Sequence, residues 1–593
     1  MLRGRSLLAL LATLAVLFWG LSWRSSHDER RGREVPDLSV DYALLSPEEA
    51  VPGEVVIDVV DWAGPDILAD IGRRIGSPLV PVGPLSEKDK IELAHVEPGR
   101  MGDALRMLAG DPHVEACCPN FIYRALFEPN DPRFKEQWNL VKVKAPDAWD
   151  ITTGKGVTVA VIDTGVAYEN HGEHFQVEDL AGIDFVKGFN FLTGQPHGND
   201  DNGHGTHVAG TIAQATNNGI GVAGIAHRCR IMPLKVLSRG GSGTVGHIAQ
   251  AIRYAADNGA KVINMSLGGR FPARVMEQAC EYAKQRGVII ICAAGNERRD
   301  SVGYPAGYSS CVAVSAIGPE DELAFYSNYG DKVAIAAPGG DKRFGEAAGI
   351  LQNTINPSNP KTQGYFSFQG TSMAAPHVAG AAALVISLGV SDPDRVLKVL
   401  QAGARKKDDP RKFGAGILDC HAAVRMAKIS EDWWRLAFAF LMGSCAFWWA
   451  WSPCTARVWP TPGFLAGLVI GSCGFFFAPL FGWSGWPFIG FLTAGFPQWD
   501  IQLLGAESHA NPLFYSVMVP MILAVLFFGV SHARRTLAGF SVGVGAHLTH
   551  AALFGLCEVQ GCLGLNRVWL LANATFCLLL AVVLIRSVSS TER

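Results

Sequence analysis

Short apolar runs alternate with helical stretches between residues 131 and 425, and this alternation strongly constrains the fold. The runs VTVAVID (157–163), KVINMSL (261–267) and GVIIICAAG (287–295) are largely apolar along their whole length, which is typical of strands buried on both faces of a sheet. Helical stretches such as GHIAQAIRYAADNG (246–259) separate them. We therefore expect an α/β fold with a doubly wound, mostly parallel sheet covered by helices.

Three polar residues lie where functional groups gather in such sheets, near the carboxyl ends of strands. Asp163 ends a buried strand, His204 follows a polar loop, and Ser372 follows Gly370 at the start of an Ala-rich helix. A serine at a helix start is often only a cap. A nucleophilic serine, however, needs a base within hydrogen-bond reach and a third group that orients the base. The combination predicts a catalytic triad of Asp163, His204 and Ser372.

The sequence resembles the subtilisin family of serine endopeptidases in three blocks: DTG (163–165), HGTHVAG (204–210) and GTSMAAPHVAG (370–380). The resemblance covers about residues 54–425. It implies hydrolysis of protein or peptide substrates through an acyl-enzyme on Ser372, with no cofactor required for the chemistry. The first histidine of HGTH becomes the base, which leaves His207 and His377 as structural helix residues.

Further blocks resemble the family's oxyanion-hole and substrate-binding segments. IICAAGNE places Asn296 where the family carries a side-chain amide, which would stabilise negative charge on the carbonyl oxygen in the transition state. Two glycine-containing segments would pair with an extended peptide as added strands. The substrate-binding residues implied are Ser266, Leu267, Gly268, Gly241, Ser242 and Gly243, together with Gly303, which leaves room for a large apolar side chain.

Oxygen-rich loops suggest a structural cation as well, because many members of the family bind calcium. The candidate ligands are Asp200, Asp201 and the loop 183–202. A solvated loop without metal is the alternative.

The N-terminal part is expected to form a separate small domain. Residues 54–128 follow a β-α-β-β-α-β pattern, which predicts an α+β, ferredoxin-like fold. They occupy the place of the family's propeptide, an intramolecular inhibitor, with self-cleavage expected near 125–132. Residues 1–27 are interpreted as a signal peptide or an uncleaved signal anchor, and residues 28–53 as a linker.

Composition changes near residue 430, where Trp-, Phe-, Leu- and Gly-rich runs with few charges begin. We expect residues 433–586 to be an all-α, multi-span membrane domain, with a sixth helix or a re-entrant segment at 485–496. The five expected spans are 436–452, 463–481, 512–531, 537–557 and 568–585. The distribution of arginines between the loops favours an extracytoplasmic peptidase domain on a multi-pass cell-membrane protein. A net charge of −3 without a basic stripe argues against nucleic acid as a partner.

Ionisable residues lie within or beside these apolar runs, and their role has several interpretations. His547 and His550 share one helical face and could bind metal, form a rhomboid-type serine/histidine pair with GWSG (482–485), or make interhelical hydrogen bonds. Asp500, Glu507 and His509 are the other such residues. Cys557 and Cys562 could form a disulfide on an oxidising side. The alternative function is a membrane sensor or binding module with an accessory peptidase domain.

Overall fold

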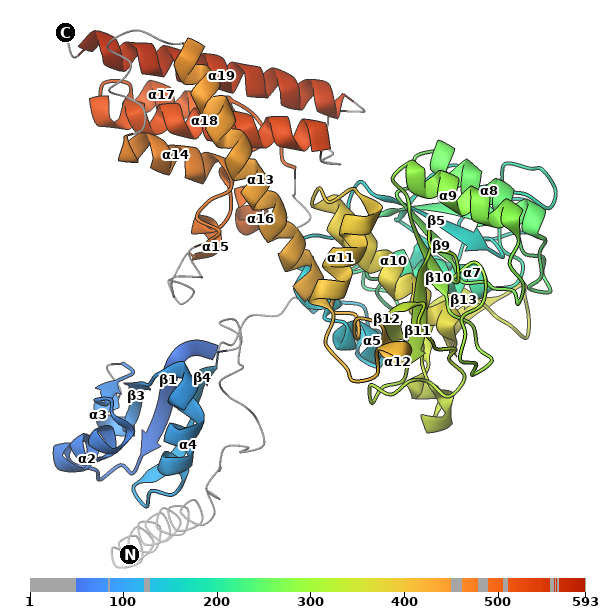
Figure 1. Ribbon diagram of the computed structural model, residues 1–593, viewed down its shortest axis with the longest axis horizontal. Helices are drawn as coiled ribbons and strands as arrows, with labels where there is room; N and C mark the ends of the chain where they lie inside the picture. Colours follow the sequence, from blue (N-terminus) through green and yellow to red (C-terminus); the bar gives the residue numbers. More distant parts are fainter. Residues whose placement is uncertain are drawn as a thin grey trace, which may run out of the picture. The chain divides into compact units, whose positions relative to one another are not determined.

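The computed structural model describes residues 50–83, 86–121, 128–449, 461–477, 489–504, 510–554, 559, 562 and 565–591. The chain divides into two compact units, the first comprising Met1–Ala125 with Phe477–Ile489, and the second the rest (Figure 1). The expected signal segment at 1–27 lies outside the described residues, as does the linker except for residues 50–53.

The N-terminal unit is a four-stranded sheet with helices packed on it. Its elements are β1 (Ala50–Val59), α2 (Pro65–Ile75), β2 (Val80–Pro81), α3 (Ser86–Asp89), β3 (Ile91–His95), α4 (Met101–Ala109) and β4 (Val114–Phe121). The strand order is β2-β3-β1-β4, and each pair is antiparallel. Alternate residues of β1, namely Val55, Ile57 and Val59, point into the core, as a half-buried strand requires.

The α/β domain (residues 128–430) is organised around an eight-stranded sheet in which every strand pair is parallel. The order is β12-β11-β10-β9-β5-β8-β6, and β7 also pairs with β8. The strands are β5 (Thr158–Asp163), β6 (Asp184–Phe185), β7 (Phe189–Asn190), β8 (Arg230–Lys235), β9 (Val262–Met265), β10 (Ile289–Ala293), β11 (Val312–Ile317) and β12 (Val333–Pro338). The expected α/β fold with a mostly parallel sheet is confirmed.

Helices cover both faces of this sheet and create two cores. Helices α7 (His204–Ala213) and α10 (Thr371–Ser387) belong to the larger core, and α8 (Val245–Asp257) and α9 (Arg274–Gln285) to the other. Nearly all of α10 is buried, so it is apolar all round, as expected for a helix inside a core. The remaining elements include α5 (Trp138–Lys142), α6 (Ala145–Trp149), the hairpin β13 (Ile350–Ile355) and β14 (Gln363–Phe368), α11 (Pro393–Gly403) and α12 (Pro410–Phe413).

The helical region (residues 431–591) contains helices near all five expected spans, but their lengths differ from the expectation. They are α13 (Cys420–Trp449), α14 (Pro462–Ser472), α15 (Ile489–Leu492), α16 (Trp499–Leu504), α17 (Met518–Phe527), α18 (Ser531–Phe554) and α19 (Asn566–Thr591). Among the described residues, one helix, Asn566–Val588, is long and apolar enough to cross a membrane. In the run 463–481, helix α14 ends at Ser472, because the next turn places Gly474 at φ +65°, a left-handed conformation that ends a helix.

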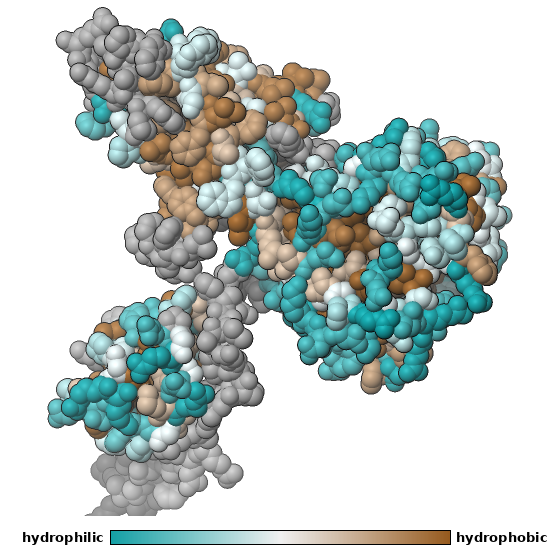
Figure 2. Space-filling model, in the orientation of Figure 1, coloured by the Kyte–Doolittle hydropathy of each residue, from teal (hydrophilic) through white to brown (hydrophobic). Residues whose placement is uncertain are grey.

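Helices α14 and α18 pack with their backbones in contact. Gly467 and Gly471 on α14 face α18, and Gly539 and Gly543 on α18 face α14, so that an added Cβ at any of them would collide with the partner's backbone. Such facing small-xxx-small pairs are typical of helices packed within membranes. Figure 2 shows that the surface of the helical region is rich in apolar residues, among them Trp448 on α13, Val525 and Leu526 on α17, and Phe576 on α19.

Candidate active site

Asp163 and His204 form a hydrogen-bonded pair between a strand end and a helix start. Asp163 is the last residue of β5 and is fully buried, and His204 is the first residue of α7. Asp163 Oδ1 accepts from His204 Nδ1 at 2.7 Å and from the Thr164 backbone N–H at 2.7 Å. This arrangement fixes Nδ1 as the protonated nitrogen of a neutral ring and leaves Nε2 as a base.

The electrostatics of this pair make the imidazole of His204 more basic than an ordinary one. Burial opposes the charge on the ring, but the charge of Asp163 and its hydrogen bond outweigh burial, and the charge of Asp200 adds to them, so the pKa of His204 is raised above its ordinary value. The side chain keeps 28% of its surface exposed, so a substrate can reach it. A base with these properties can take a proton and hold it as a stabilised imidazolium.

Ser372 lies in the first turn of α10 and forms a reciprocal pair with Ser266, which follows β9. Ser372 Oγ donates to the Ser266 carbonyl at 3.1 Å, and Ser266 Oγ donates to the Ser372 carbonyl at 2.7 Å. Asn264 Nδ2 donates in turn to Ser266 Oγ at 3.0 Å. Among the described residues, no hydrogen bond joins Ser372 Oγ to His204; the hydroxyl bonds the strand end instead.

The Asn296 side chain is oriented by Thr371, the residue before Ser372. Asn296 Oδ1 accepts from the Thr371 backbone N–H and from Thr371 Oγ1, both at 2.9 Å, and Thr371 Oγ1 accepts from the Gly295 N–H at 3.1 Å. Because a backbone N–H can only donate, the atom that it meets must be the amide oxygen. The exposed Asn296 side chain therefore presents Nδ2 as a donor. Sequence motifs gave no indication of this role for Thr371.

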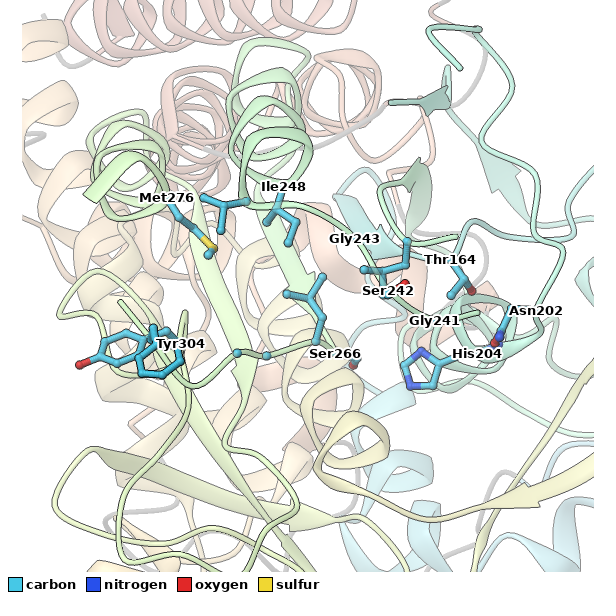
Figure 3. A pocket seen from close by; sticks show the side chains of 16 residues that line it. Thr164, Asn202, His204, Gly241, Ser242, Gly243, Ile248, Ser266, Met276 and Tyr304 are labelled. Carbon is cyan, nitrogen blue, oxygen red and sulfur yellow. The ribbon is translucent and has the colours of Figure 1, made fainter. Parts of the chain in front are cut away.

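A cleft of about 470 Å³ runs from His204 to Tyr304 (Figure 3). Six of the predicted substrate-binding residues line it: Gly241, Ser242, Gly243, Ser266, Leu267 and Gly268. Gly303 does not line it, but a Cβ at Gly303 would lie 3.3 Å from the Gly269 carbonyl at the cleft edge. Apolar side chains that the motifs did not identify complete the lining: Leu237, Val245, Ile248, Phe271 and Met276.

Asp200 and Asp201, the expected calcium ligands, form hydrogen bonds and an ion pair within the protein. Asp200 accepts hydrogen bonds from the backbone N–H groups of Asn202, Gly203 and Thr206, and from Thr206 Oγ1. It therefore satisfies N–H groups at and just before the start of α7, the helix that begins with His204. Asp201 forms an ion pair with the buried Lys235 at 2.7 Å. Both carboxylates support the strand and helix ends that carry the pair described above.

Two other buried carboxylates, Asp131 and Asp179, bond to the same loop at residues 217–222. Asp179 accepts from Asn218 Nδ2 at 3.0 Å and from the Val222 N–H at 2.8 Å, and Asp131 accepts from the Asn217 N–H at 2.7 Å. Within the described ranges neither forms an ion pair. Burial first, and then the charge of Asp131, raises the pKa of Asp179 to about 7. Carboxylate oxygens are the ligands that a hard cation prefers, so Asp131 and Asp179 suit a calcium ion.

The remaining histidines have structural surroundings. His207 is buried, and its Nε2 lies 2.8 Å from the Ile350 carbonyl; burial lowers its pKa to about 3. His377 Nδ1 lies 2.8 Å from the Met373 carbonyl, and burial lowers its pKa to about 4. In the helical region, His547 Nδ1 lies 2.7 Å from the Ser472 carbonyl and His550 Nε2 lies 3.4 Å from Glu431 Oε2. No group of three or more metal-binding side chains occurs in the part of the chain that the structure describes.

Three further expectations concern residues outside the described ranges. These are Glu507 and His509, Cys557, and the segment GWSG (482–485). Asp500 is buried and accepts from the Asn511 N–H at 3.0 Å.

Comparisons with known proteins identify the family of this chain. The model of the Subtilase family matches residues 154–416, and a model described as a domain of unknown function (DUF5942) matches residues 434–592. A "Thermophilic serine proteinase" of Bacillus sp. (strain AK1) is 37% identical over 376 residues, 63% of this chain and 88% of that protein. "Thermitase" of Thermoactinomyces vulgaris is 42% identical over 266 residues, 45% of this chain and 88% of that protein.

Among solved structures, a protease from Pseudoalteromonas arctica PAMC 21717 matches at 35% identity with a TM-score of 0.47, covering 50% of this chain and 99% of that one. The parallel sheet and the motif blocks define an α/β serine hydrolase. The chain belongs to the subtilase family and is a subtilisin-like serine endopeptidase.

The Asp131–Asp179 pair predicts a pH dependence of stability. A carboxyl group whose pKa rises from 3.8 in the unfolded chain to about 7 in the folded one retains a proton only when folded. Its stabilising contribution is therefore full below about pH 4 and is lost as pH rises to about 7. In the presence of a chelator, the unfolding midpoint of the wild type relative to Asp179→Asn should fall across this window. A constant difference would contradict the assignment.

Proposed function

We propose that the chain is a membrane-tethered endopeptidase in which Ser372 is the nucleophile, His204 the base and Asp163 the orienting carboxylate. The observation that carries this proposal is the 2.7 Å bond from His204 Nδ1 to the buried Asp163, at one end of a cleft whose wall includes Ser266, the partner of Ser372. A hydroxyl is a weak nucleophile, and its activation requires this combination of groups.

The reaction begins when Ser372 Oγ leaves the Ser266 carbonyl and attacks the scissile carbonyl carbon, while His204 Nε2 takes the hydroxyl proton. Asp163 stabilises the resulting imidazolium. The proton then passes to the leaving amine as the C–N bond breaks, which leaves an acyl-enzyme. Water attacks the ester, again with His204 as base, and Ser372 regains its proton.

Substrate would lie along Ser266–Gly268 and Gly241–Gly243 as an added strand. A substrate N–H that pairs with the Ser266 carbonyl competes with the hydroxyl of Ser372 for the same acceptor, which favours release of the nucleophile toward His204. The apolar side chains of Ile248 and Met276 in the cleft favour apolar substrate side chains, and Gly303 supports the same preference in the primary pocket.

The developing oxyanion would be stabilised by Asn296 Nδ2 and by the N–H of Ser372, one of the N–H groups in a helix's first turn that lack an intrahelical acceptor. Thr371 acts here as a positioning residue, because its N–H and hydroxyl hold the amide oxygen.

Ser372→Ala should abolish labelling by a fluorophosphonate probe and self-processing while the protein remains folded. The reason is that the variant lacks the hydroxyl that attacks the probe. Gel fluorescence of the purified protein, with mass-spectrometric mapping of the labelled peptide, makes the measurement. Labelling that persists at another serine would refute the assignment.

Thr371→Val should lower kcat by about three- to tenfold with little change in KM, because one of the two bonds that orient the Asn296 amide is lost. Thr371→Ser keeps the hydroxyl and should restore most of the turnover. Steady-state kinetics on a peptide substrate distinguish the two variants. A loss confined to KM, or no rescue by serine, would show that Thr371 acts in some other way.

We further infer that Asp131 and Asp179 hold a structural calcium ion, which takes no part in the chemistry. The support is the raised pKa of Asp179 and the absence of an ion-pair partner for either carboxylate among the described residues. Calcium would replace the retained proton, so added calcium should raise the unfolding midpoint at pH 8 in the wild type and not in Asp179→Asn.

The N-terminal unit is proposed to be the propeptide-like domain, an intramolecular inhibitor with a ferredoxin-like fold. Its strand order and its two main helices, α2 and α4, support this interpretation. The proposed cleavage segment, 125–132, is only partly described; Asn130 and Asp131 within it bond to the loop at 217–219.

The helical region is proposed to anchor the enzyme in a lipid bilayer as a multi-pass domain. Support comes from the apolar helix α19, the facing glycines of α14 and α18, and the exposed apolar side chains described above. The arginine distribution between the apolar runs favours an extracytoplasmic active site.

This proposal predicts that a membrane-impermeant fluorophosphonate labels Ser372 in intact cells, or in spheroplasts where an outer barrier exists. The protein should also remain in the membrane pellet after a high-pH wash, since apolar spans resist such extraction. Ser372→Ala provides the unlabelled control. Labelling that requires lysis would place the peptidase domain in the cytosol.

A further inference from the structure

Helix α13 belongs to two hydrophobic cores. Its first part contributes Cys420, Val424 and Ala427 to the core of the α/β domain, and its last part contributes Ala439 and Ala446 to the core of the helical region. The helix continues through 30 residues without a break. A displacement in one core is therefore felt in the other through a continuous packed element.

A buried carboxylate lies on α13 between the part of the helix that belongs to the first core and the part that belongs to the second. Glu431 keeps only 2% of its surface exposed. Its Oε1 accepts from Arg395 Nη2 of α11 at 3.0 Å, and its Oε2 lies 3.4 Å from His550 Nε2 of α18. One carboxylate group thus joins a peptidase helix to a helix of the helical region, and the His550 side chain is itself 4% exposed.

The same carboxylate lies against the far end of the helix that carries the nucleophile. Helix α10 begins at Thr371 and ends at Ser387, and the turn after it contains Gly389 at φ +116°. A Cβ at Gly389 would lie 3.4 Å from Glu431 Oε2. The turn that links α10 to α11 therefore lies close to Glu431, which also accepts the hydrogen bond from Arg395 of α11.

We propose that Glu431 is a coupling residue, through which the helical region and the peptidase domain sense each other's conformation. Arg395 is its partner on the peptidase side and His550 its partner on the helical side. Removing either partner leaves this buried charge with less compensation, so a change on either side alters the packing of the other. The helical region is then a regulatory element as well as an anchor. The activity readout below rests on the proposed role of Ser372; the structural readout does not.

Thermodynamic coupling is reciprocal. A substitution in the helical region should therefore affect the peptidase domain, and a substitution in the peptidase domain should affect the helical region. Hydrogen–deuterium exchange of the full chain in detergent micelles, in a Ser372→Ala background that prevents self-digestion, reports local opening. His550→Gln should increase exchange about fivefold or more in residues 385–403 of the peptidase domain. Arg395→Gln should do the same in residues 545–554 of α18. Glu431→Gln should increase exchange in both.

Asp394→Asn is the matched control. Asp394 precedes Arg395 on α11 and pairs with Lys284 of α9 at 2.7 Å, so the substitution loosens α11 within the peptidase domain only. It should leave exchange in α18 unchanged. If His550→Gln alters α18 alone and Arg395→Gln alters α11 alone, the coupling proposal is overturned. If one of the two variants fails to fold, the other still tests the proposal, because each is expected to change exchange in the part of the chain that it does not belong to.

The rate of fluorophosphonate labelling tests this inference separately from the proposed catalytic role of Ser372. In the active background, His550→Gln should slow fluorophosphonate labelling of Ser372 about fivefold, and Asp394→Asn should not. An unchanged labelling rate would overturn the link to the nucleophile helix. If the wild type itself is not labelled at Ser372, the triad assignment fails while the exchange result remains interpretable.

Discussion

The buried charge of Asp163 is the constraint on which the active site depends. A carboxylate with no exposed surface is costly unless it is hydrogen-bonded, and Thr164 and His204 supply its bonds. Close approach of α7 to the end of β5 makes this possible: a Cβ at Gly205 would collide with the Gly165 carbonyl. Glycine at this position is therefore required by packing, and it brings the imidazole to the carboxylate.

Much of the α/β domain could be predicted because its signals are local. Strands buried on both faces are apolar runs, and the triad motifs lie at strand and helix ends whose positions follow from the parallel sheet. The role of Thr371 could not be predicted this way, since its bond to Asn296 joins residues 75 positions apart. The proximity of Asp131 and Asp179 could not be predicted either, because these two residues are also far apart in the sequence. Asp200 and Asp201 resembled metal ligands in sequence, but α7 and Lys235 satisfy them.

In the helical region, hydropathy locates the apolar runs but does not predict the ends of the helices or their contacts. An apolar run indicates where a span begins or ends only when no turn interrupts it, and Gly474 interrupts 463–481. The expected run 512–531 likewise contains a helix of only 10 residues, Met518–Phe527. Hydropathy also carries no information about contacts between helices. Gly467 and Gly539 do not stand out in the composition of the apolar runs, yet they allow α14 and α18 to touch. Sequence spacing placed His547 and His550 on one face, but not the partners Ser472 and Glu431.

The burial of α10 explains how its two ends can have related functions. An exposed helix can bend or fray at one end without consequence, because water replaces the lost contacts. Nearly every residue of α10 is enclosed by close-packed neighbours, and such interiors transmit small shifts instead of absorbing them. Its first turn holds Ser372 and, through Thr371, the Asn296 amide, and the turn after its last residue lies close to Glu431. The geometry at Ser372 and the contacts near Glu431 therefore depend on the packing of the same helix.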